Sequence, residues 1–256
     1  MLLYEVTDGI CRITLNRPQV YNALNRELIG EITEAIQTAG ADDAVRVVVL
    51  TGAGEKAFCS GADLKEGLSG ASSLGQSLRE NYNPMILAIR NLPKPVIARL
   101  NGIAAGAGCS LALACDVRIA ADTATLSQIF INIGLVPDAG STFFLPRLVG
   151  AARAFDLAST GRMVPAQEAL NLGLVNRVVP ADQLDAVVDE VAIQYAQAPT
   201  AAIGYIKHLF NQSANGTLED QLNLEADYQD KAALTRDAGE GILAFLQKRT
   251  AKFEGH

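Results

Sequence analysis

Two separate stretches of the chain repeat one arrangement: an apolar strand, a loop rich in glycine and alanine, and a short helix of small residues. The strands are expected at Val45–Leu50 and Val96–Leu100, with loops at 51–63 and 101–108 and a helix at Cys109–Ala114. A continuous β-branched run is typical of a strand that is buried on both faces of a parallel sheet. Strand, loop and helix recur to about residue 180, which predicts a layered α/β core.

The first eighty residues carry three further local signals. The Asp8-Gly9 pair lies between two alternating apolar runs and predicts a hairpin over residues 2–16. Asn25 is placed to cap a helix that runs to about Ala39. The segment 66–76 is rich in Gly and Ser and is expected to be a mobile loop.

The last quarter of the chain has a different pattern. Beyond residue 182 the apolar residues follow the helical period, and Ala198-Pro199 interrupts it. We therefore predict two domains, a core over residues 1–198 and a C-terminal helical domain over residues 199–256. The helices expected after residue 182 cover residues 186–195, 200–210, 218–234 and 237–248.

Composition excludes several classes of function. The chain has 21 basic and 28 acidic residues, a net charge of −7 and no run of Lys and Arg, so we expect no nucleic-acid partner. Its two histidines, His208 and His256, are too few for a His-based catalytic triad or a His-rich metal site. Four cysteines without a C-x-x-C pair, no basic leader and no apolar stretch of membrane length predict a reduced, cytoplasmic protein that does not enter a membrane.

The two glycine-alanine loops could bind an anion. Small residues allow a ligand to approach the backbone, and free N–H groups at the start of a helix bind negative charge. If the loops met, two N–H donors could converge on one developing oxyanion. The same glycines could instead serve only tight packing of helix on strand.

Asp138 is the candidate acid–base residue. It lies in a Pro-containing turn among apolar side chains, and desolvation by such neighbours raises the pKa of a carboxyl group and makes it a usable general base. The alternative is structural, because P-D-x-G is a common turn and this Asp could only fix the start of a helix at Ser141. The apolar neighbours in the sequence are Phe130, Ile133, Leu135, Val136, Phe143 and Phe144.

Several motifs together resemble the crotonase, or enoyl-CoA hydratase/isomerase, superfamily. The matching segments are 57–64, 94–108, 114–120, 133–140 and 241–253, so the resemblance covers essentially the whole chain. It implies a crotonase-like spiral of β-β-α turns followed by a C-terminal helical trimerisation domain. It also implies an acyl-CoA substrate, a homotrimer or a hexamer built as a dimer of trimers, and no metal or other cofactor, since coenzyme A belongs to the substrate.

The resemblance also assigns roles to residues. It implies an oxyanion hole formed by the backbone N–H groups of Ala62 and Ala107, with Asp138 as the third catalytic residue. The substrate is expected to bind along the same loops, at Asp63, Leu64 and Gly108 as well, with Lys252 and Phe253 of the C-terminal tail at the nucleotide end of coenzyme A. Positive charge concentrated near the tail of an acidic chain supports the last assignment, although these cations could equally complement a helix end.

Departures from the superfamily pattern narrow the reaction. The two glutamates by which hydratases activate water correspond here to Ser110 and Phe130, which cannot exchange a proton at neutral pH. The resemblance therefore implies an isomerase, closest to the subgroup that converts 1,2-epoxyphenylacetyl-CoA to oxepin-CoA in phenylacetate degradation, or one that shifts a 3-enoyl double bond to the 2-position. The alternatives are a hydratase, an aromatic acyl-CoA dehalogenase with a nucleophilic Asp, and a non-catalytic RNA-binding homologue.

Overall fold

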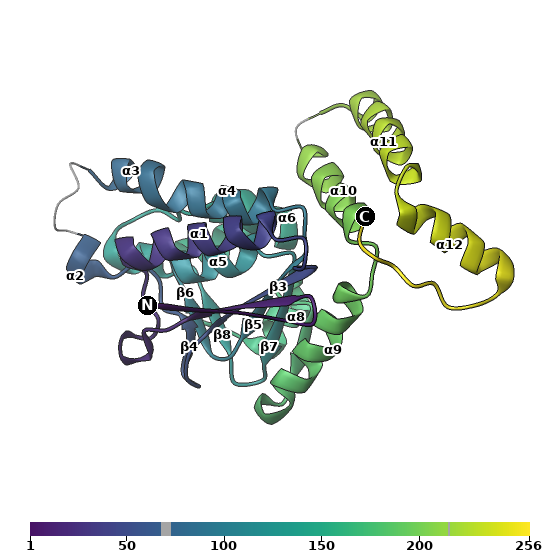
Figure 1. Cartoon of the computed structure of the whole chain (residues 1–256). Helices are drawn as coiled ribbons and strands as arrows, with labels where there is room; N and C mark the ends of the chain where they lie inside the picture. Colours follow the sequence, from purple (N-terminus) through teal and green to yellow (C-terminus); the bar gives the residue numbers. More distant parts are fainter. Residues whose placement is uncertain (68–72, 215) are drawn as a thin grey trace.

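The computed structural model describes residues 1–67, 73–214 and 216–256 (Figure 1). A six-stranded sheet in the order β1-β2-β3-β5-β7-β10 runs through its centre. Only β1 is antiparallel to its neighbour, and the other strands are parallel. Its strands are β1 (Leu2–Thr7), β2 (Ile10–Leu15), β3 (Val47–Gly52), β5 (Val96–Leu100), β7 (Val117–Ala121) and β10 (Arg177–Val179).

A smaller sheet in the order β4-β6-β8-β9 lies beside the first. Strands β3, β5 and β7 of the large sheet are each followed by a short strand of the small sheet and then by helix, which makes one turn of a spiral. The turns β3-β4, β5-β6 and β7-β8 build the crotonase-like spiral of β-β-α turns expected from the sequence. The short strands are β4 (Ala57–Cys59), β6 (Ile103–Ala105), β8 (Thr125–Ser127) and β9 (Val164–Pro165).

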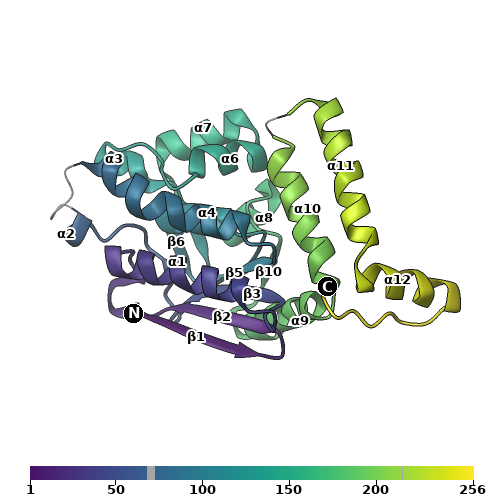
Figure 2. The ribbon, with the colours of Figure 1, turned by 45° about the horizontal axis from the view of Figure 1, so that its top comes forward.

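Helices cover both faces of the large sheet. Helices α1 and α4 lie over one face and α9 over the other, while α10 lies beside the core and α11 and α12 project away from it (Figures 1 and 2). Helix α5 is buried along its whole length. The helices are α1 (Arg26–Ala41), α2 (Leu64–Gly67), α3 (Leu74–Ser77), α4 (Asn83–Asn91), α5 (Ala107–Ala114), α6 (Ser141–Val149), α7 (Ala151–Thr160), α8 (Ala166–Leu172), α9 (Leu184–Ala196), α10 (Thr200–Gln212), α11 (Leu218–Ala233) and α12 (Arg236–Gln247). Short helical turns are η1 (Pro18–Val20), the π-helical η2 (Leu78–Tyr82), η3 (Ile129–Ile133) and η4 (Ala181–Gln183).

The strongest local predictions are confirmed. Asp8 and Gly9 both have positive φ, at 52° and 80°, and form the two-residue turn between β1 and β2. The Asn25 side chain accepts a hydrogen bond of 3.0 Å from the Leu28 N–H and caps α1. The four cysteines are free and buried. No helix in the described part of the chain combines the length and the apolar character that a membrane span requires.

Three predictions of local structure need correction. The segments 51–63 and 101–108, expected as loops, contain the strands β4 and β6, and α5 begins at Ala107 instead of Cys109. Three-residue strands are too short to show a periodicity, and they form because the spiral brings them side by side. Of the segment 66–76, residues 68–72 lie outside the described part, and α3 forms after them. The C-terminal helices are α9 to α12, whereas the division into two domains at residue 198 stays a prediction.

A buried ion holds α10 against the core. Lys207 is 7% exposed, and its Nζ donates to the Ile89 carbonyl oxygen at 2.8 Å and to the Asp116 carboxylate at 2.7 Å. Asp116 also pairs with Arg90 at 3.0 Å. One turn of helix earlier, Gly204 lies so close to the core that a Cβ there would be 2.5 Å from the Pro93 carbonyl oxygen. The backbone of α10 therefore packs directly on the core.

This contact gives a paired prediction about stability. Gly204→Ala should lower the free energy of unfolding by about 1–3 kcal/mol, because the new methyl group overlaps a backbone carbonyl. Gly30→Ala on α1, where a Cβ meets nothing within 4 Å, should raise it by about 0.5–1 kcal/mol through helix propensity. Urea denaturation of both variants measures the two changes, and effects of equal sign would contradict the packing argument.

Candidate active site

The two glycine-alanine loops meet at the end of β4 and the start of α5. A Cβ on Gly61 would be 2.8 Å from the Ala105 carbonyl oxygen and 3.5 Å from the Ala107 nitrogen. A Cβ on Gly108 would be 2.2 Å from the Cys59 carbonyl oxygen. The glycines are therefore needed for packing, and that packing is what brings the two loops together.

The N–H groups of Ala62 and Ala107 are left free by the way their neighbours bond. Leu24 pairs with the first loop on both sides of Ala62: its N–H donates to the Gly61 oxygen at 2.8 Å, and its oxygen accepts from the Asp63 N–H at 2.9 Å. In such a bridge the N–H of Ala62 points to the opposite side. Ala107 is the first residue of α5, where N–H groups have no intrahelical acceptor. Within the described ranges neither N–H has a recorded acceptor, so both can receive an anion.

Asp138 lies in a strained turn between η3 and α6. Ala139 has φ 49° and Gly140 φ 81°, and a left-handed residue other than glycine costs about 1 kcal/mol or more. The Asp138 main-chain oxygen accepts from the Ser141 N–H at 3.0 Å, but no side chain caps α6. The Asp138 Oδ1 atom is buried and has no hydrogen-bond partner. The structure therefore does not support the reading of Asp138 as a capping residue.

Burial makes the Asp138 carboxyl group a weaker acid than usual. Desolvation raises the pKa of Asp138 from 3.8 to about 6. The expectation that all six apolar neighbours cause this is too broad, because Phe130 is 7% exposed but Val136 is 78% exposed. A carboxyl group with a pKa near 6 is mostly ionised at neutral pH and still basic enough to accept a proton from carbon.

The other residues expected to bind substrate fall into two places. Asp63 lies in the first loop, where its carboxylate forms a part-buried ion pair of 2.9 Å with Arg17. Leu64 follows it and is 52% exposed at the start of α2. The sequence analysis did not identify Arg17, because its partner Asp63 is 46 residues away in the chain. Lys252 and Phe253 follow α12, and the tail after α12 lies at the opposite end of the molecule from α2, which follows the first loop (Figures 1 and 2).

Two carboxylates of α12 hold the C-terminal tail in place. Asp237 is 3% exposed and accepts from the N–H groups of Glu254 and Gly255, both at 2.7 Å. Glu240 accepts from the Lys252 N–H at 2.8 Å and pairs with both terminal nitrogens of Arg249, at 2.6 and 2.8 Å. These contacts, led by Arg249, lower the pKa of Glu240 to about 2. Arg249 is thus neutralised within the tail.

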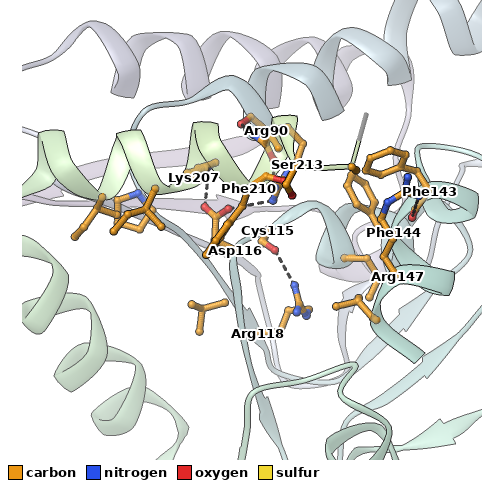
Figure 3. Close-up of a pocket in the computed structure, with 18 of the residues that line it drawn as sticks. Arg90, Cys115, Asp116, Arg118, Phe143, Phe144, Arg147, Lys207, Phe210 and Ser213 are labelled. Atoms are coloured by element: carbon orange, nitrogen blue, oxygen red, sulfur yellow. Dashed lines mark hydrogen bonds and ion pairs between the residues drawn. The ribbon is translucent and has the colours of Figure 1, made fainter. Parts of the chain in front are cut away.

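A cavity of about 450 Å³ lies elsewhere, between α10 and the core (Figure 3). Asp116 occupies its centre between Lys207 and Arg90, and Phe143 and Phe144 form the opposite wall (Figure 3). It opens beside Cys115, just past the carboxyl end of α5, whereas the Ala107 N–H is at the amino end. The cavity is therefore separate from the amino end of α5, where Ala107 lies.

Comparisons with known proteins agree with this geometry. The model of the enoyl-CoA hydratase/isomerase family matches residues 5–256. The chain is 40% identical to "1,2-epoxyphenylacetyl-CoA isomerase" of Escherichia coli (strain K12), over 99% of this chain and 98% of that protein. It is 44% identical to "Probable enoyl-CoA hydratase" of Rhodobacter capsulatus, over 98% of this chain and 97% of that protein. The crystal structure of an enoyl-CoA hydratase from Bacillus anthracis superimposes with a TM-score of 0.94 at 37% identity, covering 100% of this chain and 99% of that one.

The chain belongs to the enoyl-CoA hydratase/isomerase family. In this family member, the two positions expected to carry the hydratase glutamates contain no acid. The Ser110 hydroxyl is fully buried and donates to the Gly106 oxygen at 3.2 Å within α5. The ring of Phe130 packs against the turn at Gly106, where a Cβ would be 3.9 Å from its Cζ. Asp138 is thus the acid that the expected catalytic set retains.

The raised pKa of Asp138 predicts a pH-dependent cost in stability. The folded-state pKa, about 6, exceeds the unfolded value near 3.8, so ionisation of Asp138 destabilises the fold increasingly as pH rises from 4 through 6. Asp138→Asn cannot ionise. Its free energy of unfolding, relative to the parent protein, should therefore rise by about 1–2 kcal/mol between pH 4 and pH 8, a value discounted for partial solvent contact. Urea denaturation across this pH range measures the difference, and a constant difference would contradict the assigned pKa.

Proposed function

We propose that the protein is an acyl-CoA isomerase that works through an enolate of the thioester. One observation carries the proposal: the expected catalytic set contains a single acid. Asp138 has a buried carboxylate oxygen without a partner, Ala62 and Ala107 have free backbone N–H groups, and the positions of Ser110 and Phe130 supply no second acid. A hydratase needs groups that activate and place a water molecule. An isomerase can use one carboxylate, because the proton removed from one carbon is returned to another.

The proposed reaction divides the work among three groups. The Ala62 and Ala107 N–H groups bind the thioester oxygen as it gains negative charge, and the loss of one such donor typically costs about 3 kcal/mol in the transition state. Asp138 removes a proton from the carbon next to the thioester, which leaves the electron pair in a dienolate. The same carboxyl group then returns the proton at the far carbon. The reaction consumes no cofactor, since coenzyme A is part of the substrate.

For the acyl group, we propose 1,2-epoxyphenylacetyl-CoA, a 3-enoyl-CoA, or both. The Escherichia coli relative, named as an isomerase of the epoxide, supports the first at 40% identity. The Rhodobacter relative, named as a hydratase, keeps hydration as the second candidate. A dehalogenase would use Asp138 as a nucleophile, and a crotonase-like RNA-binding homologue would need no intact site.

Asp138→Asn tests the proposed chemistry directly. The amide is isosteric with the carboxyl group but cannot accept a proton, so turnover should fall at least 10³-fold, a loss on the order expected for a proton-transfer group, while acyl-CoA binding changes only a few-fold. Because substrate and product are isomers of equal mass, liquid chromatography that separates them, followed by mass spectrometry of each peak, measures the loss with 1,2-epoxyphenylacetyl-CoA and 3-hexenoyl-CoA.

Two outcomes would overturn this assignment. Retained isomerisation in the variant would remove Asp138 from the mechanism. A product of the parent enzyme heavier than the substrate by one water would instead identify a hydratase.

The tail is proposed to bind the nucleotide end of coenzyme A in a neighbouring subunit. Gly255 lies beside Arg46, close to the carboxyl end of α1, whereas Ala62 bridges to Leu24 just before its amino end. A helix of this length spans roughly 24 Å, so the core separates the tail from the site of its own chain. Because Glu240 neutralises Arg249, Lys252 and Phe253 are left to contact phosphate and adenine.

A homotrimer, or a hexamer of two trimers, would supply that neighbour. Helices α11 and α12 project from the core (Figures 1 and 2) and expose large apolar side chains that a soluble monomer would rarely leave uncovered. These side chains support a subunit interface along the C-terminal helices. They are Leu218, Leu222, Leu234, Ile242, Leu243, Phe245 and Leu246.

Lys252→Ala tests the role of the tail without removing the backbone contacts to Asp237 and Glu240. KM for the acyl-CoA should rise roughly 5-fold or more at low salt, and the effect should shrink as salt screens the phosphate charge. The same acyl group on pantetheine, which lacks the nucleotide, should show no change. Equal effects on both substrates, or none on either, would show that the tail only completes α12.

A further inference from the structure

The cavity between α10 and the core concentrates positive charge in a chain whose net charge is −7. Four cations line it, and among the described residues that line it Asp116 is the one acid. The remaining lining is mostly apolar, and a volume of about 450 Å³ is in the range of sites that bind small molecules. The four cations are Arg90, Arg118, Arg147 and Lys207.

The Asp116 carboxylate is occupied by two of these cations. Its Oδ1 atom accepts from Arg90 at 3.0 Å, and its Oδ2 atom accepts from Lys207 at 2.7 Å. Within the described ranges, the other two cations, on β7 and α6, form no ion pair. A single carboxylate cannot balance four cations, so the cavity keeps an excess of positive charge.

Arg118 is the buried member of this unpaired set. It is 5% exposed, and its Nε donates to the Leu174 oxygen at 2.6 Å and its Nη1 to the Cys115 oxygen at 2.7 Å (Figure 3). In the described part of the chain its Nη2 has no recorded acceptor, and protein does not fully enclose this atom, so it is free to donate to a ligand in the cavity. A buried charge that is bonded only to neutral carbonyl groups costs free energy, and a bound anion would offset that cost.

Aromatic rings form the wall opposite Asp116. The rings of Phe143 and Phe144 meet edge to face with their centroids 5.4 Å apart, and the Arg147 guanidinium lies 3.6 Å from the Phe143 centroid (Figure 3). Phe210 of α10 lines the same cavity and is 71% exposed. A free guanidinium N–H together with three phenylalanine rings suits a molecule that has an anionic head and an apolar body.

We propose that this cavity is a second ligand site, which binds a free carboxylic acid with an apolar body, such as a phenylalkanoate. The carboxylate accepts a hydrogen bond from the Arg118 guanidinium, and the apolar body packs on Phe143 and Phe144. Inorganic phosphate is a poorer occupant, because it needs more donors than Arg118 has free and leaves the rings uncovered. The site goes beyond the proposed acyl-CoA chemistry and does not depend on it, since the cavity opens past the carboxyl end of α5 and Ala107 lies at the amino end.

The test compares 4-phenylbutyrate with 4-phenylbutyramide, which has the same shape without the charge. Isothermal titration calorimetry of the parent protein should give a dissociation constant roughly 10-fold lower for the acid, the ratio that one charge-assisted hydrogen bond supplies. Arg118→Gln removes the charge and should reduce this ratio to about 1. The acid should bind equally well when hexanoyl-CoA, a saturated acyl-CoA, is present at saturation, and inorganic phosphate should bind more weakly than the acid.

Phe210→Glu provides a second variant, because Arg118→Gln also removes the bonds to two carbonyl groups and can impair folding. A carboxylate on this exposed position of α10 repels an anionic ligand and should weaken 4-phenylbutyrate by roughly 10-fold or more. Phe155→Glu on α7 is the matched control, because Phe155 is 75% exposed and does not line the cavity. It should leave the dissociation constant within about 2-fold, as expected for a distant site.

Several results would overturn the proposal. Equal affinity for the acid and the amide, or unchanged binding in Phe210→Glu, would remove the charge of the cavity from the recognition. Competition by hexanoyl-CoA would place the acid in the acyl-CoA site instead, and phosphate that binds as tightly as the acid would show that the rings contribute nothing. If the parent protein binds neither ligand, the cavity is closed or filled by a neighbouring subunit in the assembled protein, and it is not a ligand site.

Discussion

The direct backbone contact between β4 and α5 is the constraint on which the site depends. The Cys59 oxygen lies where a Cβ of residue 108 would be, and the Ala105 oxygen lies close to where a Cβ of residue 61 would be. Only glycine allows two chains to approach so closely. This approach places Gly61, the residue before Ala62, beside the Ala107 nitrogen, a proximity that neither loop could create alone. The packing of the core and the proposed function therefore both require glycine at residues 61 and 108.

Several features of the site lower the stability of the fold and suit the proposed chemistry. Asp138 is held partly out of water without a hydrogen bond to its Oδ1, and the next residue has a left-handed backbone. Each feature destabilises the fold, and each suits the carboxyl group to the proton transfer that we propose for it. The helices α5 and α6 pack against each other and hold this turn in place.

The two ends of the parallel strands serve different purposes. The two glycine-alanine loops are at one end, and at the other Lys207, Asp116 and Arg90 hold α10 against the core. The tail is fixed at this second end by Asp237 and Glu240, facing away from its own site. The tail held by these two carboxylates and the exposed apolar side chains of α11 and α12 are the features that support the proposed nucleotide subsite in a neighbouring subunit.

The sequence by itself determined the elements whose signals are local. The hairpin at Asp8-Gly9, the cap at Asn25, the central strands and the C-terminal helices follow from turn chemistry, capping and periodicity, which depend on near neighbours in the chain. The two loops and Asp138 were also found from local composition, and the resemblance to a family assigned their roles. Only the tertiary structure decided the rest. Strands β4 and β6 form because the spiral aligns them. The pKa of Asp138 depends on the side chains that bury it, and fewer of its apolar neighbours in the sequence are buried than the sequence analysis expected. The contacts of Arg17 with Asp63 and of the tail with α12 join residues that are far apart in the chain, and the sequence pattern does not show which distant segments meet.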